Sequence, residues 1–398
     1  MRRNCWNYCD IKSGVALGIP YLSLVEHYDI IIVGGGLAGL TAALHLKAEG
    51  HAVLVFEKQD YPHHKVCGEY VSNEVVPYLK RLGITLDSAN SVAIHTLRLS
   101  TQRGKALRTQ LPLGGKGISR YHLDHLLFQR ARSIGVLFKM ERVTNVHFEG
   151  HDFTVTSASG TSIRAKVVIG AFGKRSALDK RLKRPFIQEK SPWLGVKAHY
   201  EYDAFPENEV ALHNFEGGYG GLSKTESGAV NFCYLARYSS FKKHQGISDF
   251  NTKVVGRNPF LAHFLSKAKP LFPEPLAIAQ ISFAQKEAVG NHILMCGDSA
   301  GLIHPLCGNG MAMAIHSAKL ASEQIHSYLG DPEYSRRQME LRYQRQWQSH
   351  FAARMRTGRW LQSLLLNPNL SDMAMKTIVQ SSFLTNKIIQ RTHGIPIV

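Results

Sequence analysis

Three closely spaced glycines near the start of the chain have the spacing needed to hold a phosphate group. Gly34, Gly36 and Gly39 form a GxGxxG pattern directly after the apolar run at residues 30–33. In such a pattern the first glycine permits a tight turn and the second lets a pyrophosphate approach the backbone. The third allows a helix to pack closely on a strand. The N-terminus of the following helix would present free N–H groups to the phosphates.

Glu57 supplies the second half of this expected site. The helix after the glycines ends at Gly50, and an apolar strand at residues 52–56 ends just before Glu57. A carboxylate at this distance from the glycines accepts hydrogen bonds from a ribose hydroxyl in dinucleotide-binding units. The sequence therefore predicts an α/β fold with a Rossmann-like domain. This unit alone does not distinguish NAD from FAD, although its position near the N-terminus favours FAD.

A second glycine-bearing segment lies at residues 293–320, where a short apolar strand ends at Gly297 and Asp298. A helix is expected to begin at Met311. The segment resembles the Gly-Asp segment of FAD enzymes built on the p-hydroxybenzoate hydroxylase plan, and most closely the geranylgeranyl reductase branch; flavin halogenases are more distant relatives. The resemblance implies that Gly297 and Asp298 contact the ribityl chain of FAD. It places at the pyrimidine edge of the flavin Gly308, Asn309, Gly310 and Met311.

The same resemblance extends to segments between the two motifs. "SRYHLDHLL" resembles the family's arginine-bearing helix start, which makes Arg120 the expected pyrophosphate partner. The alternative is an ordinary surface arginine near a helix start. "KVCGEYVS" resembles a segment that lies along the flavin, so Lys65, Cys67 and Gly68 are expected beside the ring system. The resemblance also implies FAD contacts from Leu37, Ala38, Lys58 and Val143.

Two residues are candidates for catalysis. Cys67 is a small buried packing residue, a thiol that faces the substrate and moves a proton, or a marker inherited from the family. Tyr219, in "GYGGLSKTE", lines the substrate pocket or belongs to the core of a sheet. The residues around Tyr219 predict a pocket that is roomier and more polar than a pure isoprenoid slot.

The chain departs from its hydroxylase relatives at "VVIGAFGKRS", where Phe172 stands in place of an aspartate. In the family that aspartate helps to handle FAD and NAD(P)H. NAD(P)H therefore stays only one candidate electron donor, beside a separate flavin reductase or a ferredoxin-like protein.

The domain organisation follows from a change of pattern along the chain. Residues 186–282 alternate apolar and polar side chains, which is typical of an antiparallel sheet with one covered face. We expect a substrate-binding β domain at 81–104 and 186–282, inserted into an FAD-binding domain at 28–80, 105–185 and 283–330. Residues 1–27 are predicted to be a disordered N-terminal extension, and residues 331–398 a C-terminal helical cap.

Charge and cysteine content limit the partners. The chain has 48 basic and 30 acidic residues, a net charge of +18, and six cysteines without a CxxC pair. We expect no metal site, no nucleic-acid partner and a cytoplasmic protein with reduced thiols. The tail combines arginines with an apolar stripe, so it either packs on the FAD domain or contacts a membrane surface or acyl-carrier protein peripherally. That stripe consists of Tyr343, Trp347, Phe351 and Met355.

These observations predict an FAD-dependent oxidoreductase that passes hydride between flavin N5 and a hydrophobic small-molecule substrate. The substrate would be isoprenoid or polyketide-like, and the reaction a C=C reduction or desaturation. One alternative is a monooxygenase or halogenase that acts through a C4a-oxygen adduct. Another, from a different class, is a non-catalytic basic protein with a flavin fold that binds a membrane or nucleic acid.

Overall fold

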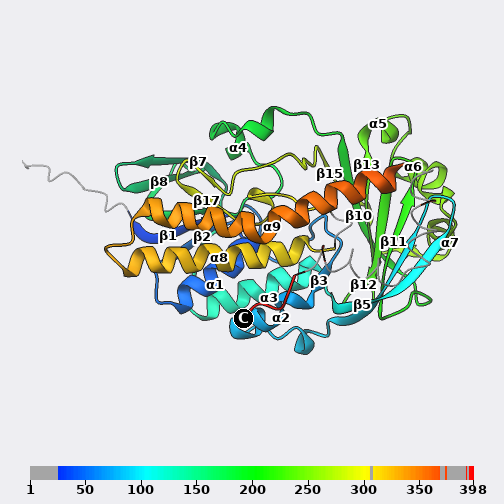
Figure 1. The fold of residues 1–398 in the computed structure, drawn as a ribbon, viewed down its shortest axis with the longest axis horizontal. Helices are drawn as coiled ribbons and strands as arrows, with labels where there is room; N and C mark the ends of the chain where they lie inside the picture. The colour runs from blue at the N-terminus through cyan, green and yellow to red at the C-terminus, as the bar shows by residue number, and fades with distance from the viewer. Residues whose placement is uncertain (1–25, 305–307, 368–372, 374–390, 392–393) are drawn as a thin grey trace, which may run out of the picture.

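The structure is a computed structural model that describes residues 26–304, 308–367, 373, 391 and 394–398. In this part of the chain, two sheets lie side by side along the long axis of the molecule (Figure 1). The first is a sheet of eight strands in the order β16-β17-β9-β1-β2-β6, with β8 on β9 and β7 on β8. Its strands are β1 (His27–Val33), β2 (Val53–Phe56), β6 (Leu137–Lys139), β7 (Val143–Glu149), β8 (Asp152–Ser157), β9 (Ser162–Gly170), β16 (Val289–Gly290) and β17 (Ile293–Met295).

The first sheet has the parallel centre expected of a dinucleotide-binding domain. Strand β1 pairs in parallel with both β2 and β9, and the side chains of Ile30, Ile31 and Ile32 are fully buried. Helices pack on it and bury this apolar run, which is why the strand lacks polar alternation. The helices of this half are α1 (Leu37–Ala48), α2 (Val76–Arg81), α3 (Arg120–Ser133), α4 (Ala177–Arg181), α8 (Gly310–Gly330) and α9 (Arg336–Leu366).

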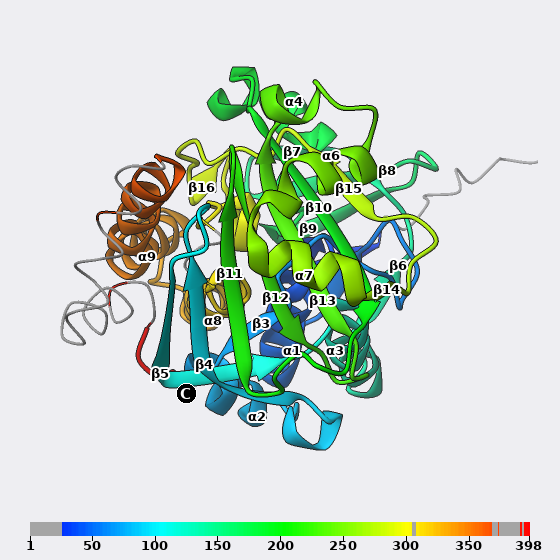
Figure 2. The same ribbon diagram turned by 90° about the vertical axis from the view of Figure 1, so that its right-hand side faces the viewer.

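The second sheet has nine strands in the order β14-β10-β13-β12-β11-β4-β5-β3, with β15 on β10. Figure 2 shows helices α6 and α7 covering its outer face, and Figure 1 labels α5 near one end of the same sheet. Its strands are β3 (Tyr70–Ser72), β4 (Val92–Ser100), β5 (Ala106–Gly117), β10 (Trp193–Glu201), β11 (Glu209–Phe215), β12 (Gly218–Lys224), β13 (Val230–Arg237), β14 (Lys269–Pro270) and β15 (Leu276–Ala279). The covering helices are α5 (Tyr238–Phe241), α6 (Ile247–Lys253) and α7 (Pro259–Lys267).

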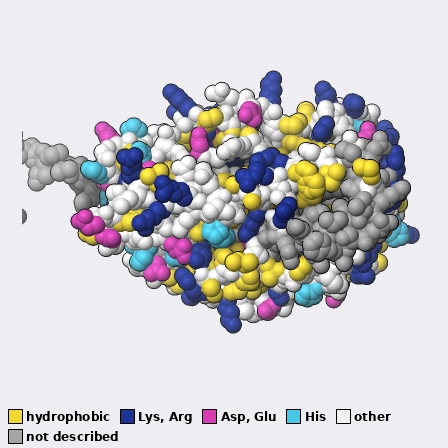
Figure 3. Space-filling view, in the orientation of Figure 1, with side chains coloured by type: hydrophobic (Ala, Val, Ile, Leu, Met, Phe, Trp, Pro, Cys, Tyr) yellow, Lys and Arg dark blue, Asp and Glu magenta, His cyan; other side chains and the backbone are white. Residues whose placement is uncertain are grey.

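The C-terminal helix packs on the first domain through its apolar stripe. Tyr343 and Phe351 are fully buried, and Trp347 and Met355 are nearly so. Gly301 makes room for this contact, because a Cβ there would lie 2.9 Å from the Trp347 ring. Arg354 pairs with the buried Glu74 carboxylate at 3.1 Å, and Arg336 packs over the Phe148 ring. The other arginines of α9 are exposed, and Figure 3 shows basic side chains spread over this face among acidic and apolar ones. None of the helices within the described ranges is long and apolar enough to cross a bilayer.

Several expected boundaries differ from the structure. Strand β5 pairs with β4 in the second sheet, whereas residues 105–185 were all expected in the FAD domain. Helix α8 begins at Gly310 rather than Met311. The alternating pattern of residues 186–282 did not reveal α5 to α7, because these helices are short and covered on one face only. Of the expected N-terminal extension, residues 1–25 lie outside the described residues, as does most of the tail beyond α9.

Candidate functional site

The turn after β1 is open only at Gly36. A Cβ at Gly34 would collide with the carbonyl oxygen of Ala171, and one at Gly39 with the carbonyl oxygen of Gly34. A Cβ at Gly36 would instead lie 3.6 Å from an Arg120 guanidinium nitrogen. Gly36 is also the N-cap of α1, and no side chain caps the helix there. The backbone N–H groups at this end of α1 therefore face a positively charged space that an anion can fill.

Glu57 fixes the shape of this turn. One carboxylate oxygen accepts a 2.8 Å hydrogen bond from the Gly35 amide, and the other accepts bonds from the Lys58 and Gln59 amides at 2.9 and 3.2 Å. The side chain is buried at the end of β2. A carboxylate offers about four acceptor positions. Glu57 therefore keeps capacity for the ribose hydroxyl that the sequence predicts.

A buried carboxylate positions the two basic side chains near Gly36. Asp124, one turn into α3, accepts bonds from Arg120 Nε at 2.7 Å and from Lys65 Nζ at 2.9 Å. Burial alone would raise the pKa of Asp124, but Arg120 and Lys65 outweigh it and hold that pKa below its usual range. Two cations around one anion leave a surplus positive charge. Sequence analysis missed Asp124, although its spacing of four residues from Arg120 was a usable signal.

The second glycine-bearing turn packs directly against the first. Gly297 adopts a φ of +59°, and a Cβ there would lie 3.1 Å from the Cβ of Ala38 and 3.3 Å from that of Ala314. Ala38 belongs to the start of α1, and Ala314 to the start of α8. The two remote motifs thus meet in space. Asp298, next in the chain, is half-buried at this junction.

Lys286 holds the Gly-Asp turn in place and was not anticipated. Its Nζ donates to the carbonyl oxygens of Asp298 at 2.7 Å and Lys174 at 2.9 Å. Burial lowers the pKa of Lys286 to about 8, against the opposing charges of Asp298 and Asp179. A bridging ammonium of this kind joins two loops at one end of the first sheet. No local motif marks it, because its acceptors are backbone carbonyls.

The segment from Lys65 to Gly68 lies between the two sheets. The Cys67 and Gly68 carbonyl oxygens accept bonds from Asn231 Nδ2 at 3.2 Å and Ser223 Oγ at 3.3 Å, both from the second sheet. Cys67 is half-buried against the main core. A Cβ at Gly68 would meet no atom within 4 Å, so the backbone faces open space there. This is the space that the predicted flavin contact requires.

Gly308 and Asn309 contact the chain just after that segment. A Cβ at Gly308 would lie 3.5 Å from the Tyr70 ring, and Asn309 Nδ2 lies 3.4 Å from a Glu74 carboxylate oxygen. Gly310 begins α8, and Met311 is buried. The remaining expected contacts are dispersed, because Lys58 is exposed, Leu37 is buried in α1, and Val143 is buried at the start of β7. Their FAD contacts stay predictions.

A second buried carboxylate, Glu69, joins the two sheets. One oxygen accepts from Lys197 Nζ and, at 2.8 Å, from the Arg120 amide; the other lies 2.6 Å from His199 Nε2. All three side chains are buried, and Glu69 has a φ of +55°. Burial would raise the pKa of Glu69, but the His199 bond and the Lys197 charge hold it low. Sequence analysis missed this cluster entirely.

The face of the second sheet that lies toward Cys67 changes from polar to apolar along its length. Lys197 is paired across the strands with Cys233, which is paired with Gly221. Burial raises the pKa of Cys233 to about 12. Cys233 lies two residues after Asn231, whose side chain bonds to the Cys67 carbonyl oxygen. Tyr219 lies at the apolar end of this face. The apolar cluster there comprises Trp193, Tyr219, Leu235, Ile281 and Leu302.

Tyr219 occupies the centre of that cluster rather than a solvent-lined wall. It is 3% exposed, and its ring centroid lies 5.3 Å from that of His304. Burial lowers the pKa of His304 to about 3, so this imidazole is neutral at physiological pH. The structure brings Tyr219 close to the loop after the Gly297 turn. Cys67 belongs to a different apolar cluster, because it packs against the main core.

The residues around Gly36 and Gly68 fit the dinucleotide that the sequence predicts. The open, uncapped end of α1 and the surplus charge of Arg120 and Lys65 suit a pyrophosphate. The empty space at Gly68, between the two sheets, suits a planar ring system. Bound there, FAD would supply hydride or electron transfer, while the protein supplies position and charge.

Comparisons with known proteins agree with this fit. A family described as "FAD binding domain" matches residues 27–331. A menaquinone reductase from Mycobacterium tuberculosis (strain CDC 1551 / Oshkosh) is 24% identical over 77% of this chain and 78% of its own. The structure of a flavin-dependent brominase aligns with a TM-score of 0.76 at 18% identity, covering 92% of this chain and 93% of that one.

A geranylgeranyl bacteriochlorophyll reductase-like protein from Thermoplasma acidophilum has the same fold. Its structure aligns with a TM-score of 0.75 at 18% identity, over 92% of this chain and 96% of that one. The predicted fold class, the FAD cofactor and the resemblance to this group of flavoproteins are therefore confirmed.

Proposed function

Because the chain belongs to the FAD binding domain family and is an FAD-dependent oxidoreductase, we propose that it transfers hydride between flavin N5 and a hydrophobic isoprenoid or polyketide-like substrate. The reaction is the reduction or formation of a C=C bond. The apolar cluster around Tyr219, next to the Gly297 turn, carries this proposal. It offers an apolar surface beside the cofactor position, where a substrate carbon can be held and water excluded.

The residues of the chain divide the work. Gly36, Arg120 and Lys65 bind the pyrophosphate, and Asp298 binds the ribityl chain. In the reducing direction, hydride adds to one alkene carbon and the other carbon takes a proton. Cys67 is the proposed proton donor, because its loop is fixed at the backbone by Asn231 and Ser223. The resulting thiolate takes a proton from solvent. In total, the alkene gains one hydride from the flavin and one proton that solvent replaces.

The electron source lies outside the described contacts. Phe172 is half-buried against the core, where relatives of the hydroxylase type carry an aspartate. Reduction by NAD(P)H is therefore one arm of the test, and a separate flavin reductase or ferredoxin-like protein the other. Contact with an acyl carrier or a membrane surface is a further proposal, supported by the exposed arginines of α9.

Anaerobic stopped-flow absorbance tests the proposal. The FAD-loaded protein is reduced with dithionite, NADH or NADPH and mixed with menaquinone or a geranylgeranyl lipid. We expect substrate-dependent reoxidation of the flavin without oxygen. Cys67→Ala should slow it about a hundredfold or more, the range for loss of a general acid. Cys233→Ala, at the neighbouring position, is the matched control and should retain most of the rate.

Three results would count against this reading. Reoxidation that requires oxygen and yields a hydroxylated or halogenated product would favour the monooxygenase or halogenase alternative. Retained FAD with no reoxidation by any substrate would favour a binding protein. Equal rates for Cys67→Ala and Cys233→Ala would remove Cys67 from the reaction and leave the hydride transfer itself standing.

A further inference from the structure

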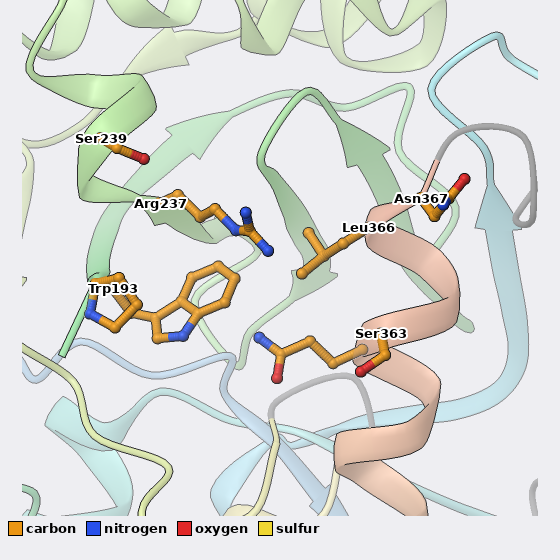
Figure 4. A pocket seen from close by; sticks show the side chains of 8 residues that line it. Trp193, Arg237, Ser239, Ser363, Leu366 and Asn367 are labelled. Carbon is orange, nitrogen blue, oxygen red and sulfur yellow. The ribbon is translucent and has the colours of Figure 1, made fainter.

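A cavity of about 680 Å³ lies between the end of α9 and the adjacent ends of β10 and β13 in the second sheet. Figure 4 shows Trp193 and Arg237 on the sheet side, directed toward Leu366 on the helix. Gln362 lines the cavity from one turn earlier in α9. The cavity is half-open to solvent, and it lies away from Gly36 and the phosphate end of the candidate FAD site. The proposed reaction gives it no role so far.

Arg237 provides a cation in this cavity that is available to a ligand. Its side chain is exposed, and the guanidinium carbon lies 5.9 Å from the centre of the Trp193 ring. No carboxylate among the described residues forms an ion pair with it. A guanidinium stacked on an aromatic face keeps its N–H edges free for a planar or tetrahedral oxyanion.

Gln362 provides a second, independent sign of a ligand. Its side chain is 9% exposed, and its Nε2 has no hydrogen-bond acceptor within the described part of the chain. A buried donor without an acceptor costs free energy, so such groups are rare unless a ligand completes them. The amide and the Arg237 guanidinium line the same cavity. Both are donors, and neither has an acceptor among the residues that the structure describes.

The apolar walls of the cavity continue inward. Trp193 and Leu366 belong to the same apolar cluster as Tyr219 and Leu302. Leu302 follows the turn at Gly297, which packs on α1 at the candidate FAD site. A molecule with its polar end at Arg237 would thus have apolar surface for the rest of its length, leading toward the flavin.

We infer that this cavity binds the anionic end, a carboxylate or phosphate, of an amphiphilic substrate. Arg237 and Gln362 donate to the anion, while the apolar part lies on Trp193 and Leu366 and reaches toward Tyr219. This inference rests on the proposed function for the nature of the substrate. It narrows that substrate from any hydrophobic molecule to one with a single anionic head group.

Isothermal titration of the FAD-loaded protein tests the inference. The probes are oleate, oleyl phosphate and the neutral oleyl alcohol, each below its micelle-forming concentration, with acetate and inorganic phosphate as head groups alone. We expect both anionic amphiphiles to bind at least about tenfold more tightly than the alcohol, the range for a charge-assisted hydrogen bond. Acetate and phosphate alone should not bind measurably at these concentrations.

Variants locate the effect. Arg237→Gln should abolish the preference for the anions, and Gln362→Leu should weaken their binding several-fold. Arg359→Gln removes the same charge from an exposed position of α9 outside the cavity and should leave binding unchanged. Arg237→Lys, which keeps the charge without the fork, should bind with intermediate affinity. Flavin absorbance and the unfolding temperature verify that each variant is folded.

Equal binding of oleate and oleyl alcohol would overturn the inference, as would equal losses in Arg237→Gln and Arg359→Gln. Tight binding of acetate or phosphate alone would show a simple anion site and would also overturn it. These titrations involve no turnover. The hydride transfer could therefore fail while anionic amphiphiles still bind, or neutral lipids could be reduced with no role for Arg237.

Discussion

Two buried carboxylates each bind two basic side chains, and they differ in what surrounds them. Asp124 lies in the FAD-binding half, and its partners Arg120 and Lys65 keep 13% and 25% of their side chains exposed. Glu69 lies between the two sheets, and its partner Lys197 is 0% exposed. The composition of the two clusters is almost the same. Their accessibility is different.

This difference in exposure indicates that the two clusters, although similar in charge, have different functions. At Asp124 the partly exposed cations can add a ligand, because Arg120 lies 3.6 Å from where a Gly36 side chain would begin. At Glu69 the donors are used up within the protein, so the cluster holds the second sheet against the segment that carries Cys67. A buried ion pair is weak evidence of net stability, but removing one partner is costly.

Exchanging the lysine in each cluster for glutamine would test this contrast most strongly. Lys197→Gln leaves the buried Glu69 carboxylate short of a charged partner and should lower the free energy of unfolding by about 3–5 kcal/mol. Lys65→Gln, at a partly exposed site, should lower it by about 1 kcal/mol or less. The same Lys65→Gln change should weaken FAD binding about tenfold. Urea unfolding and flavin fluorescence titration measure the two quantities.

This interpretation of the two clusters would be wrong if Lys197→Gln and Lys65→Gln showed each other's expected effects. A stable Lys197→Gln protein with poor FAD affinity would make the Glu69 cluster part of the ligand site. A double variant, Lys197→Gln with Glu69→Gln, is the matched control. It removes both charges and should recover part of the lost stability.

Gly36→Ala isolates the ligand-binding side of the comparison. Gly36 has a φ of −82°, and an added Cβ would make only ordinary contacts, at 3.6 Å to Arg120 and 3.8 Å to Lys65. The free energy of unfolding without FAD should therefore change by less than about 1 kcal/mol. The methyl group would occupy the pyrophosphate position, and overpacking of about 1–3 kcal/mol corresponds to FAD binding about 5 to 150 times weaker. Titration of the FAD-free variant with FAD measures it.

Unchanged FAD affinity in Gly36→Ala would show that the phosphates do not approach this turn. Gly39→Ala is the contrasting variant, since its Cβ would collide with the Gly34 carbonyl oxygen. It should unfold the domain rather than affect FAD alone.

The sequence could predict the ligand side of the comparison because its information is local. The glycines, Glu57 and Arg120 lie in short patterns whose mechanics are known, and the Gly297 turn carries a similar pattern. Asp124 could also have been predicted, because it lies four residues after Arg120 on an expected helix. The contact between Gly297 and Ala38 could be expected only because both patterns belong to the site of one cofactor. Neither pattern by itself encodes the contact.

The cluster around Glu69, between the two sheets, could not be predicted in the same way. Glu69 and Lys197 are 128 positions apart and meet only when strand β10 is in register in the second sheet. A lysine and a histidine alternating along a strand suggest a solvent-facing side, whereas here that side faces another domain. Strand β5 was assigned to the FAD domain for the same reason, since its pairing with β4 is a matter of topology.

The smallest of the predicted effects is the change in the free energy of unfolding with pH. It should come from buried histidines before it comes from the two carboxylate clusters. Burial lowers the pKa of His213, in the second sheet, to about 3, and that of His45, in α1, to about 4. Both are near 6.5 in an unfolded chain. Between these values the unfolded state binds more protons, so stability is lost as pH falls below about 6.5. Each histidine contributes about 1.4 kcal/mol per pH unit in that window.

The two carboxylate clusters also lose stability as pH falls, but in a lower pH window. The pKa values of Asp124 and Glu69 are lowered, so the stability they contribute is present above about pH 4 and lost only as pH falls through their folded pKa values. Urea unfolding of His213→Asn between pH 6.5 and 4.5 should therefore show a shallower pH slope. His263→Asn, at an exposed position of the same domain, should keep the original slope. FAD affinity of the folded protein should stay constant within a few-fold over that range, because the Asp124 cluster keeps its charge; a steep loss would mean that this cluster titrates with the histidines.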